Sequence, residues 1–161
     1  MDIDGFGTDE QVTLTVYGGT PLSNPGVGGW AYRLRLNGQV IERSGAESVA
    51  TNNRMELFAV IAGLESTSAC NIRIVSDSQY LVRGGSKLPI WKRFGWRLTP
   101  RGRMIKNDDL WKRVDNLVKG RHVAWDWKRH GEAGHDHDAC CRLAIQTAVA
   151  QSLLGPADQA A

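Results

Sequence analysis

Apolar and polar residues alternate along the first part of the chain in the pattern of half-buried β-strands. In VTLTVYGGT the apolar residues Val12, Leu14 and Val16 alternate with polar or aromatic neighbours, and WAYRLRL shows the same two-residue period. Asn37-Gly38 follows, a strong signal for a tight hairpin turn, with QVIERSG as the partner strand. The pattern predicts a strand followed by a β-hairpin.

From residue 51 the apolar period becomes helical. Leu57, Ile61 and Leu64 recur at helical spacing, and Thr51, together with the two asparagines after it, offers N-cap side chains. Further along, the pattern predicts strands in NIRIVS and HVAWDWK, and helices in SQYLVRGG, NDDLWKRVDNLVKG and ACCRLAIQTAVAQSLL. The second of these helices has Asn107 as its expected cap. Strands and helices in this order indicate an α/β domain.

Length and composition fit one domain and exclude several classes of protein. The chain has 161 residues, and its three cysteines cannot form a disulfide framework. No apolar run is long enough to cross a membrane, and the acidic N-terminus lacks the features of a signal peptide. We therefore expect a cytoplasmic protein with an acidic extension over residues 1–10, a domain over 11–153 and a flexible tail over 154–161.

The net charge of +3 hides a strong segregation. Residues 83–130 hold fourteen Lys or Arg against four acids, whereas the remainder holds six basic and thirteen acidic residues. The basic segment also contains five of the six tryptophans. Cations interleaved with aromatic rings suit phosphate neutralisation and stacking, so the segment favours a nucleic acid partner. The alternative is a solvated loop with tryptophans tucked into the core.

Four segments resemble type 1 ribonuclease H, and the resemblance extends over residues 12–150. They are SNPGVGGWAY at 23–32, TNNRMEL at 51–57, SDSQYLVRGG at 76–85, and WKRFGW with NDDLW at 91–96 and 107–111. The resemblance implies a five-stranded mixed sheet with helices on both faces. It also implies a basic handle at about residues 87–106 and a groove for an RNA/DNA hybrid.

The resemblance also implies a metal-dependent chemistry for which this chain is incompletely equipped. Enzymes of the family cut the RNA strand with two divalent ions, normally Mg²⁺, held by four carboxylates. Glu56 and Asp77 match two of the four, but Gly18 and Cys141 stand at the other two positions. A thiol is a poor ligand for Mg²⁺. The expected cofactor is therefore Mg²⁺ or Mn²⁺, held weakly by Glu56 and Asp77 or not at all.

Nearby side chains offer partial substitutes for the missing groups. His130 or His135 approximates the histidine of the family's flexible loop. Asp138, three residues before Cys141, would share its helix face if the helix starts early enough, and Asp136 and Glu132 lie in the preceding loop. None of them replaces the carboxylate missing at position 18.

The residues that resemble the family's nucleic acid contacts are largely kept. Asparagine and glutamine match minor-groove contacts, Thr51 and Asn107 match a phosphate pocket, and Trp91 matches a handle tryptophan that packs along DNA sugars. Turn and cap chemistry is the structural alternative for the asparagines, and core packing for Trp91. The full set is Asn24, Thr51, Asn52, Asn53, Gln79, Trp91, Lys92, Arg93, Trp96, Arg97, Arg101, Arg103, Lys106 and Asn107.

These residues predict a pseudoenzyme that binds RNA/DNA hybrids or related duplexes and has lost most or all of its nuclease activity. One alternative is an active ribonuclease H with a site rearranged around Glu56, Asp77 and Asp138. Another is a protein-interaction or scaffold module. We expect a monomer without membrane association and leave a protein partner open.

A cluster of metal-type ligands lies near the C-terminus. It consists of His130, His135, His137, Cys140 and Cys141. The spacing matches no standard zinc pattern, and adjacent cysteines rarely chelate one ion well. The cluster is interpreted as a polar loop followed by helix-core thiols, and whether it binds a metal stays open.

Overall fold

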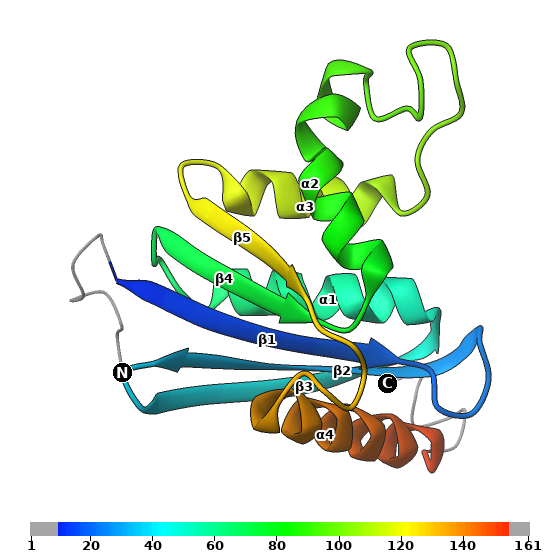
Figure 1. Ribbon diagram of the computed structural model, residues 1–161. Helices are drawn as coiled ribbons and strands as arrows, with labels where there is room; N and C mark the ends of the chain where they lie inside the picture. Colours follow the sequence, from blue (N-terminus) through cyan, green and yellow to red (C-terminus); the bar gives the residue numbers. More distant parts are fainter. Residues whose placement is uncertain (1–9, 155–161) are drawn as a thin grey trace.

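The protein is built on one mixed five-stranded sheet, which the computed structural model describes together with its helices over residues 10–154 (Figure 1). The strands are β1 (Gln11–Gly19), β2 (Gly26–Leu36), β3 (Gln39–Ala50), β4 (Asn71–Ser76) and β5 (His122–Trp127). Their order across the sheet is β3-β2-β1-β4-β5. The first three are antiparallel, and β4 and β5 run parallel to β1. The expected mixed sheet is confirmed.

Helices cover both faces of this sheet. On one face α1 (Asn52–Glu65) packs against β1 and β2, with α3 (Asp108–Val118) beside it. On the opposite face α4 (His135–Ser152) crosses β1, β2 and β3. The fourth helix, α2 (Gln79–Arg93), starts beside the end of β4 and projects away from the sheet (Figure 1). None of these helices has the length and apolar character needed to cross a bilayer.

The alternation in β1 divides its side chains between the two layers. Val12, Leu14 and Val16 are buried in the main core, to which α1 also contributes. On the other face a smaller cluster of Ala31, Cys140 and Ala144 joins β2 to α4. The two-residue period that predicted the strand therefore also separates the two packing layers.

The hairpin prediction is confirmed at the level of the backbone. Asn37 has φ +48° and Gly38 has φ +84°, and Leu36 pairs directly with Gln39. Two consecutive positive φ angles are the requirement of the tight turn that Asn-Gly favours.

Two boundaries differ from the predictions. Helix α4 begins at His135 rather than 139, after Gly134 with φ +96°, and two aspartates in its first turn favour that earlier start. Helix α2 continues through Pro89 to Arg93, so the first part of the basic handle is helical. Asn107 does occupy the N-cap of α3, but it has φ +60° and its side chain caps nothing. Of the predicted termini, residues 1–9 and 155–161 lie outside the described residues.

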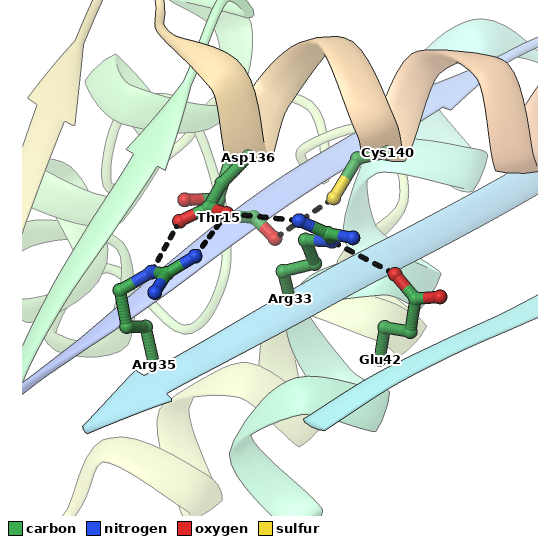
Figure 2. Close-up of polar contacts among 6 residues, drawn as sticks. All are labelled: Thr15, Arg33, Arg35, Glu42, Asp136 and Cys140. Carbon is green, nitrogen blue, oxygen red and sulfur yellow. Dashed lines mark hydrogen bonds and ion pairs between the residues drawn. The ribbon is translucent and has the colours of Figure 1, made fainter. Parts of the chain in front are cut away.

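An ionic contact fastens the first turn of α4 to the sheet (Figure 2). Each carboxylate oxygen of Asp136 accepts a hydrogen bond from the Arg35 guanidinium at 2.8 Å. One of these oxygens also accepts a hydrogen bond from Arg33 at 3.1 Å. Arg33 also pairs with Glu42 on β3 at 2.8 Å. The hydrogen bonds from Arg35 outweigh partial burial and lower the pKa of Asp136 to about 2.

This depressed pKa makes a pH-dependent contribution to stability. Asp136→Asn is expected to lower the free energy of unfolding by about 1–2 kcal/mol at pH 7. The wild-type contribution is complete above the unfolded-state pKa of about 4 and disappears as the pH falls towards the folded-state pKa of about 2. Urea unfolding of both proteins between pH 2 and 7 measures the difference, which a pH-independent gap would contradict.

Candidate active site and nucleic-acid interface

The carboxyl ends of β1 and β4 meet the N-terminal turns of α1 and α2 at one edge of the sheet (Figure 1). Glu56 on α1 and Asp77 after β4 line a cleft of about 430 Å³ there, together with Gly18 at the end of β1. The resemblance places metal ligands at all three positions. The structure therefore brings the two remaining carboxylates and the vacated position into one site.

Glu56 lies deep in this cleft, with only 4% of its surface exposed. Ser76 donates to its carboxylate at 3.4 Å, and the Gly18 N–H donates to it as well. Burial, followed by the nearby charge of Asp77, raises the pKa of Glu56 well above its ordinary value. The cleft therefore holds this carboxyl away from solvent, in contact with Ser76 and the Gly18 backbone.

Asp77 is engaged by two histidines. Its Oδ2 lies 2.6 Å from His130 Nδ1 and 3.5 Å from His137 Nε2. Burial raises the pKa of Asp77, but the two imidazoles more than offset this and hold the pKa below its usual value. The carboxylate is thus ionised at neutral pH, with its charge directed towards the histidines.

Gly18 leaves no room for a carboxylate at its own position. A Cβ atom there would lie 2.2 Å from the backbone carbon of Met55 and 2.3 Å from the backbone nitrogen of Glu56. These are fixed backbone atoms of α1 and not the ends of flexible side chains. The packing of β1 against α1 is therefore adapted to glycine, and any side chain would force the two elements apart.

Cys141 faces the same side of α4 as His137, one turn away. Its Sγ lies 3.6 Å from His137 Nδ1. Burial, reinforced by the charge of Asp77, raises the pKa of this thiol to about 12. Without a metal the side chain is a neutral thiol at physiological pH and offers no hard ligand.

Most of the predicted substitute ligands point elsewhere. Asp136 is held by Arg33 and Arg35, while Glu132 and His135 line a separate depression beside it. Asp138 is exposed and does not line the cleft. The expectation that an aspartate of this region could supply a fourth carboxylate is therefore wrong for Asp136. Of the two candidate loop histidines, His130 is the one that reaches Asp77.

These residues do not fit a pair of Mg²⁺ ions. Paired divalent ions need several anionic oxygen ligands to offset their repulsion. The cleft instead offers one buried carboxyl with a raised pKa and one carboxylate in contact with histidine. The donor set lies closer to what a single ion of softer character prefers.

The asparagines around the cleft also stabilise the local backbone. Asn52 Oδ1 accepts from both the backbone and the hydroxyl of Thr20 at 2.8 Å, and Asn24 Oδ1 accepts from the Asn52 backbone at 3.3 Å. Asn53 and Gln79 are exposed in the first turns of their helices. The turn chemistry considered as an alternative is therefore present, and it sets a polar rim at the mouth of the cleft.

Thr51 and Asn107, the two expected phosphate contacts, are connected through a residue that the sequence analysis missed. Thr51 caps α1 by accepting from the Arg54 backbone at 3.3 Å, and the Arg54 guanidinium donates to Asn107 Oδ1 at 3.1 Å. The same guanidinium donates two hydrogen bonds to the Asp109 carboxylate, at 2.9 and 3.1 Å. Asn107 in turn donates to Tyr80 at 3.0 Å. The position of Arg54 within the TNNRMEL segment was the sequence feature that could have identified it as a site residue.

The basic handle, helical up to Arg93 and a loop beyond it, presents exposed cations. Trp91 is partly buried and packs edge-on against Trp111, with 5.4 Å between the ring centroids. The core packing considered as an alternative for Trp91 is therefore present. Trp96 also packs against the core, and Arg97 bonds the carbonyl of Gly102 at 3.0 Å. Lys92 pairs with Asp115. The remaining handle cations are exposed and form no ion pair within residues 10–154, namely Lys87, Arg93, Arg101, Arg103 and Lys106.

Comparison with known proteins identifies relatives over most of the chain. The profile of the RNase H family matches residues 10–149. Ribonuclease H of Nitrosospira multiformis is 42% identical over 137 residues, covering 81% of this chain and 87% of the relative. Ribonuclease H of Legionella pneumophila is 43% identical over 134 residues, covering 80% and 92%.

Solved structures show the same fold. LC9-RNase H1, described as a type 1 RNase H with the type 2 active-site motif, superposes with a TM-score of 0.70 at 27% identity and covers 88% of this chain and 73% of that one. LC11-RNase H1, solved in complex with an RNA/DNA hybrid, has a TM-score of 0.66 at 14% identity and covers 88% and 99%. At that identity the second likeness supports the fold alone.

Proposed function

This chain belongs to the ribonuclease H family, and we propose that it binds RNA/DNA hybrids and cleaves them slowly or not at all. The observation that carries the proposal is the contrast between the basic handle and the cleft. The cations of the handle are exposed, whereas the cleft lacks the anionic oxygens of a two-metal site.

The binding half of the proposal rests on charge and polar contacts placed around the cleft. Arg93, Arg101, Arg103 and Lys106 are free to neutralise phosphates. Thr51, Arg54 and Asn107 form a second polar group at the N-termini of α1 and α3. Asparagines at the rim suit contacts to the 2′-hydroxyls that distinguish RNA from DNA.

The cleavage half rests on the ligand set. Members of the family use divalent metal ions, and hydrolysis by that route needs an activated water and a stabilised leaving oxygen. Gly18 offers no ligand, and Glu56 is buried with a raised pKa. Asp77 is the one cleft carboxylate held in its ionised form, and it contacts His130.

The second candidate function is an active ribonuclease H with a rearranged site. The relatives at 42–43% identity are named Ribonuclease H, and a solved neighbour carries a variant active-site motif. Here Asp77, with His130 beside it, would have to support cleavage with a different ligand set. Parallel cleavage assays of wild type and Asp77→Asn on one labelled hybrid separate the two candidates.

Hybrid binding is expected to be tight at low salt and strongly salt-dependent. We expect a Kd of about 1 µM or lower near 50 mM salt, weakening about a hundredfold by 200 mM if four handle cations contact phosphates. Fluorescence anisotropy with a labelled RNA/DNA hybrid, and with duplex DNA of the same sequence, measures both properties. Hybrid should bind more tightly than DNA because of its 2′-hydroxyls. No binding at low salt, or equal binding of both duplexes, would contradict the proposal.

A further inference from the structure

We propose that His130, His137 and Cys141, with Asp77, form a binding site for a single transition-metal ion of the zinc class. The site lies where α4, the loop before it and the end of β4 meet. It stands independently of hybrid binding, since it shares only Asp77 with the carboxylates of the cleft and can be tested without nucleic acid.

The donor atoms converge from three separate segments. One ligand atom each from His130, His137 and Cys141 lie within 4.8 Å of one another. Asp77 Oδ2 adds a fourth donor, 2.6 Å from His130 Nδ1 and 3.5 Å from His137 Nε2. Tetrahedral zinc, with bonds of about 2.0–2.3 Å, places its donors about 3.3–3.8 Å apart. To complete the shell, the more distant donors must approach one another and His130 Nδ1 must separate from Asp77 Oδ2, and His130 is exposed on a loop that permits both movements.

His137 supplies a second observation that points to a ligand. The residue is completely buried. Among residues 10–154 its Nε2 is the sole buried side-chain nitrogen or oxygen that forms no well-aligned hydrogen bond, although the Asp77 carboxylate lies 3.5 Å away. A buried ring nitrogen left unpaired costs free energy, and a metal ion would use its lone pair. The ring also stands edge-on to Tyr17 at 5.7 Å and to His130 at 5.8 Å, so its position is fixed by packing.

The helix supplies the spacing. His137 and Cys141 are four residues apart on α4, so they share one face. This pair exists because α4 begins at His135, before the predicted start at 139. Cys140 instead contacts the carbonyl of Thr15 at 3.6 Å and packs in the small cluster with Ala31 and Ala144. The adjacent cysteines therefore do not compete for one ion.

The chemistry of the donors selects the ion. Imidazole and thiolate are ligands of Zn²⁺ and Co²⁺, and a combination of two histidines, one cysteine and one carboxylate closes a four-coordinate shell. Mg²⁺ prefers oxygen ligands and octahedral geometry, so the same site discriminates against it. Binding deprotonates the Cys141 thiol and releases its proton to solvent.

The test is metal binding by the full chain, purified metal-free under reducing conditions. Equilibrium dialysis against Zn²⁺ is expected to give one ion per chain, undiminished by a large excess of Mg²⁺. With Co²⁺ the protein is expected to show thiolate-to-cobalt charge-transfer absorption and the visible bands of tetrahedral cobalt. The variants Cys141→Ser and His130→Ala should each weaken binding more than about tenfold, since even outer-shell changes commonly cost that much.

Matched controls keep the outcome decisive. Cys70→Ser and His122→Ala alter an exposed cysteine and an exposed histidine outside the cluster and should leave binding unchanged. Circular dichroism checks that each variant is folded, and the cobalt spectrum of the wild type stands without any variant. The proposal is overturned if the wild type binds substantially less than one ion, if its Co²⁺ complex lacks the thiolate band, or if Cys141→Ser binds as tightly as wild type.

Discussion

Gly18→Ala is expected to lower the free energy of unfolding by about 3 kcal/mol, at the upper end of ordinary overpacking. The added methyl would meet backbone atoms of Met55 and Glu56 at 2.2–2.5 Å. Relief of that contact requires the end of β1 and the N-terminal part of α1 to separate. Chemical denaturation of wild type and variant measures the loss.

The adjacent glycine provides the control. At Gly19 the nearest atom to a new Cβ is the Tyr17 hydroxyl at 3.1 Å, the end of a side chain. Gly19→Ala should therefore cost less than about 1 kcal/mol. Equal stability of Gly18→Ala and wild type would contradict the packing argument.

The same contact predicts that a carboxylate cannot simply be restored. Gly18→Asp, alone or with Cys141→Asp, is expected to be destabilised at least as much as Gly18→Ala and to gain no metal-dependent cleavage. The result is measured by unfolding and by hydrolysis of a labelled hybrid. A stable variant that cuts efficiently would show that the loss of the ligand is easily reversed.

The second large effect concerns the handle. Reversal of Arg101, Arg103 and Lys106 to glutamate is expected to weaken hybrid binding at least about thirtyfold near 100 mM salt and to reduce the salt slope by about three. These side chains are exposed and form no ion pair or side-chain hydrogen bond within residues 10–154, so the fold should persist. Anisotropy titrations at several salt concentrations measure both quantities.

A variant with the same change in net charge tests whether position matters. Reversal of Arg43, Lys119 and Arg142 alters exposed cations outside the handle, on β3, after α3 and on α4. We expect a loss of only a few-fold from the general field, because screening limits distant charges to about 10 Å at 0.1 M salt. Equal losses in the two triple variants would mean that binding follows net charge and not the handle.

Much of the architecture could be predicted from the sequence because its signals are local. The alternation of Val12, Leu14 and Val16 and the Asn37-Gly38 turn each identify an element through its own residues. The start of α4 could not be predicted in the same way. It depends on Gly134 and on the contact of Asp136 with arginines more than a hundred residues earlier in the chain.

The site shows the same division. The resemblance implied a common site for Glu56 and Asp77, and both residues line one cleft in the structure. The meeting of His130 and His137 at Asp77 could not be deduced, because it requires the loop path and the early helix start together. The tight approach of Met55 to Gly18 is likewise a property of packing between elements.

The central claim is that the chain holds an RNA/DNA hybrid without cutting it efficiently. The most direct measurement follows binding and cleavage of one labelled hybrid with Mg²⁺ and with Mn²⁺. Wild type and Asp77→Asn are purified in parallel from a host without its own ribonuclease H. Wild type is expected to bind the hybrid. Its rate of hybrid cleavage is expected not to exceed the rate measured with Asp77→Asn. Metal-dependent cleavage by wild type that disappears in Asp77→Asn would contradict the central claim and establish the active enzyme.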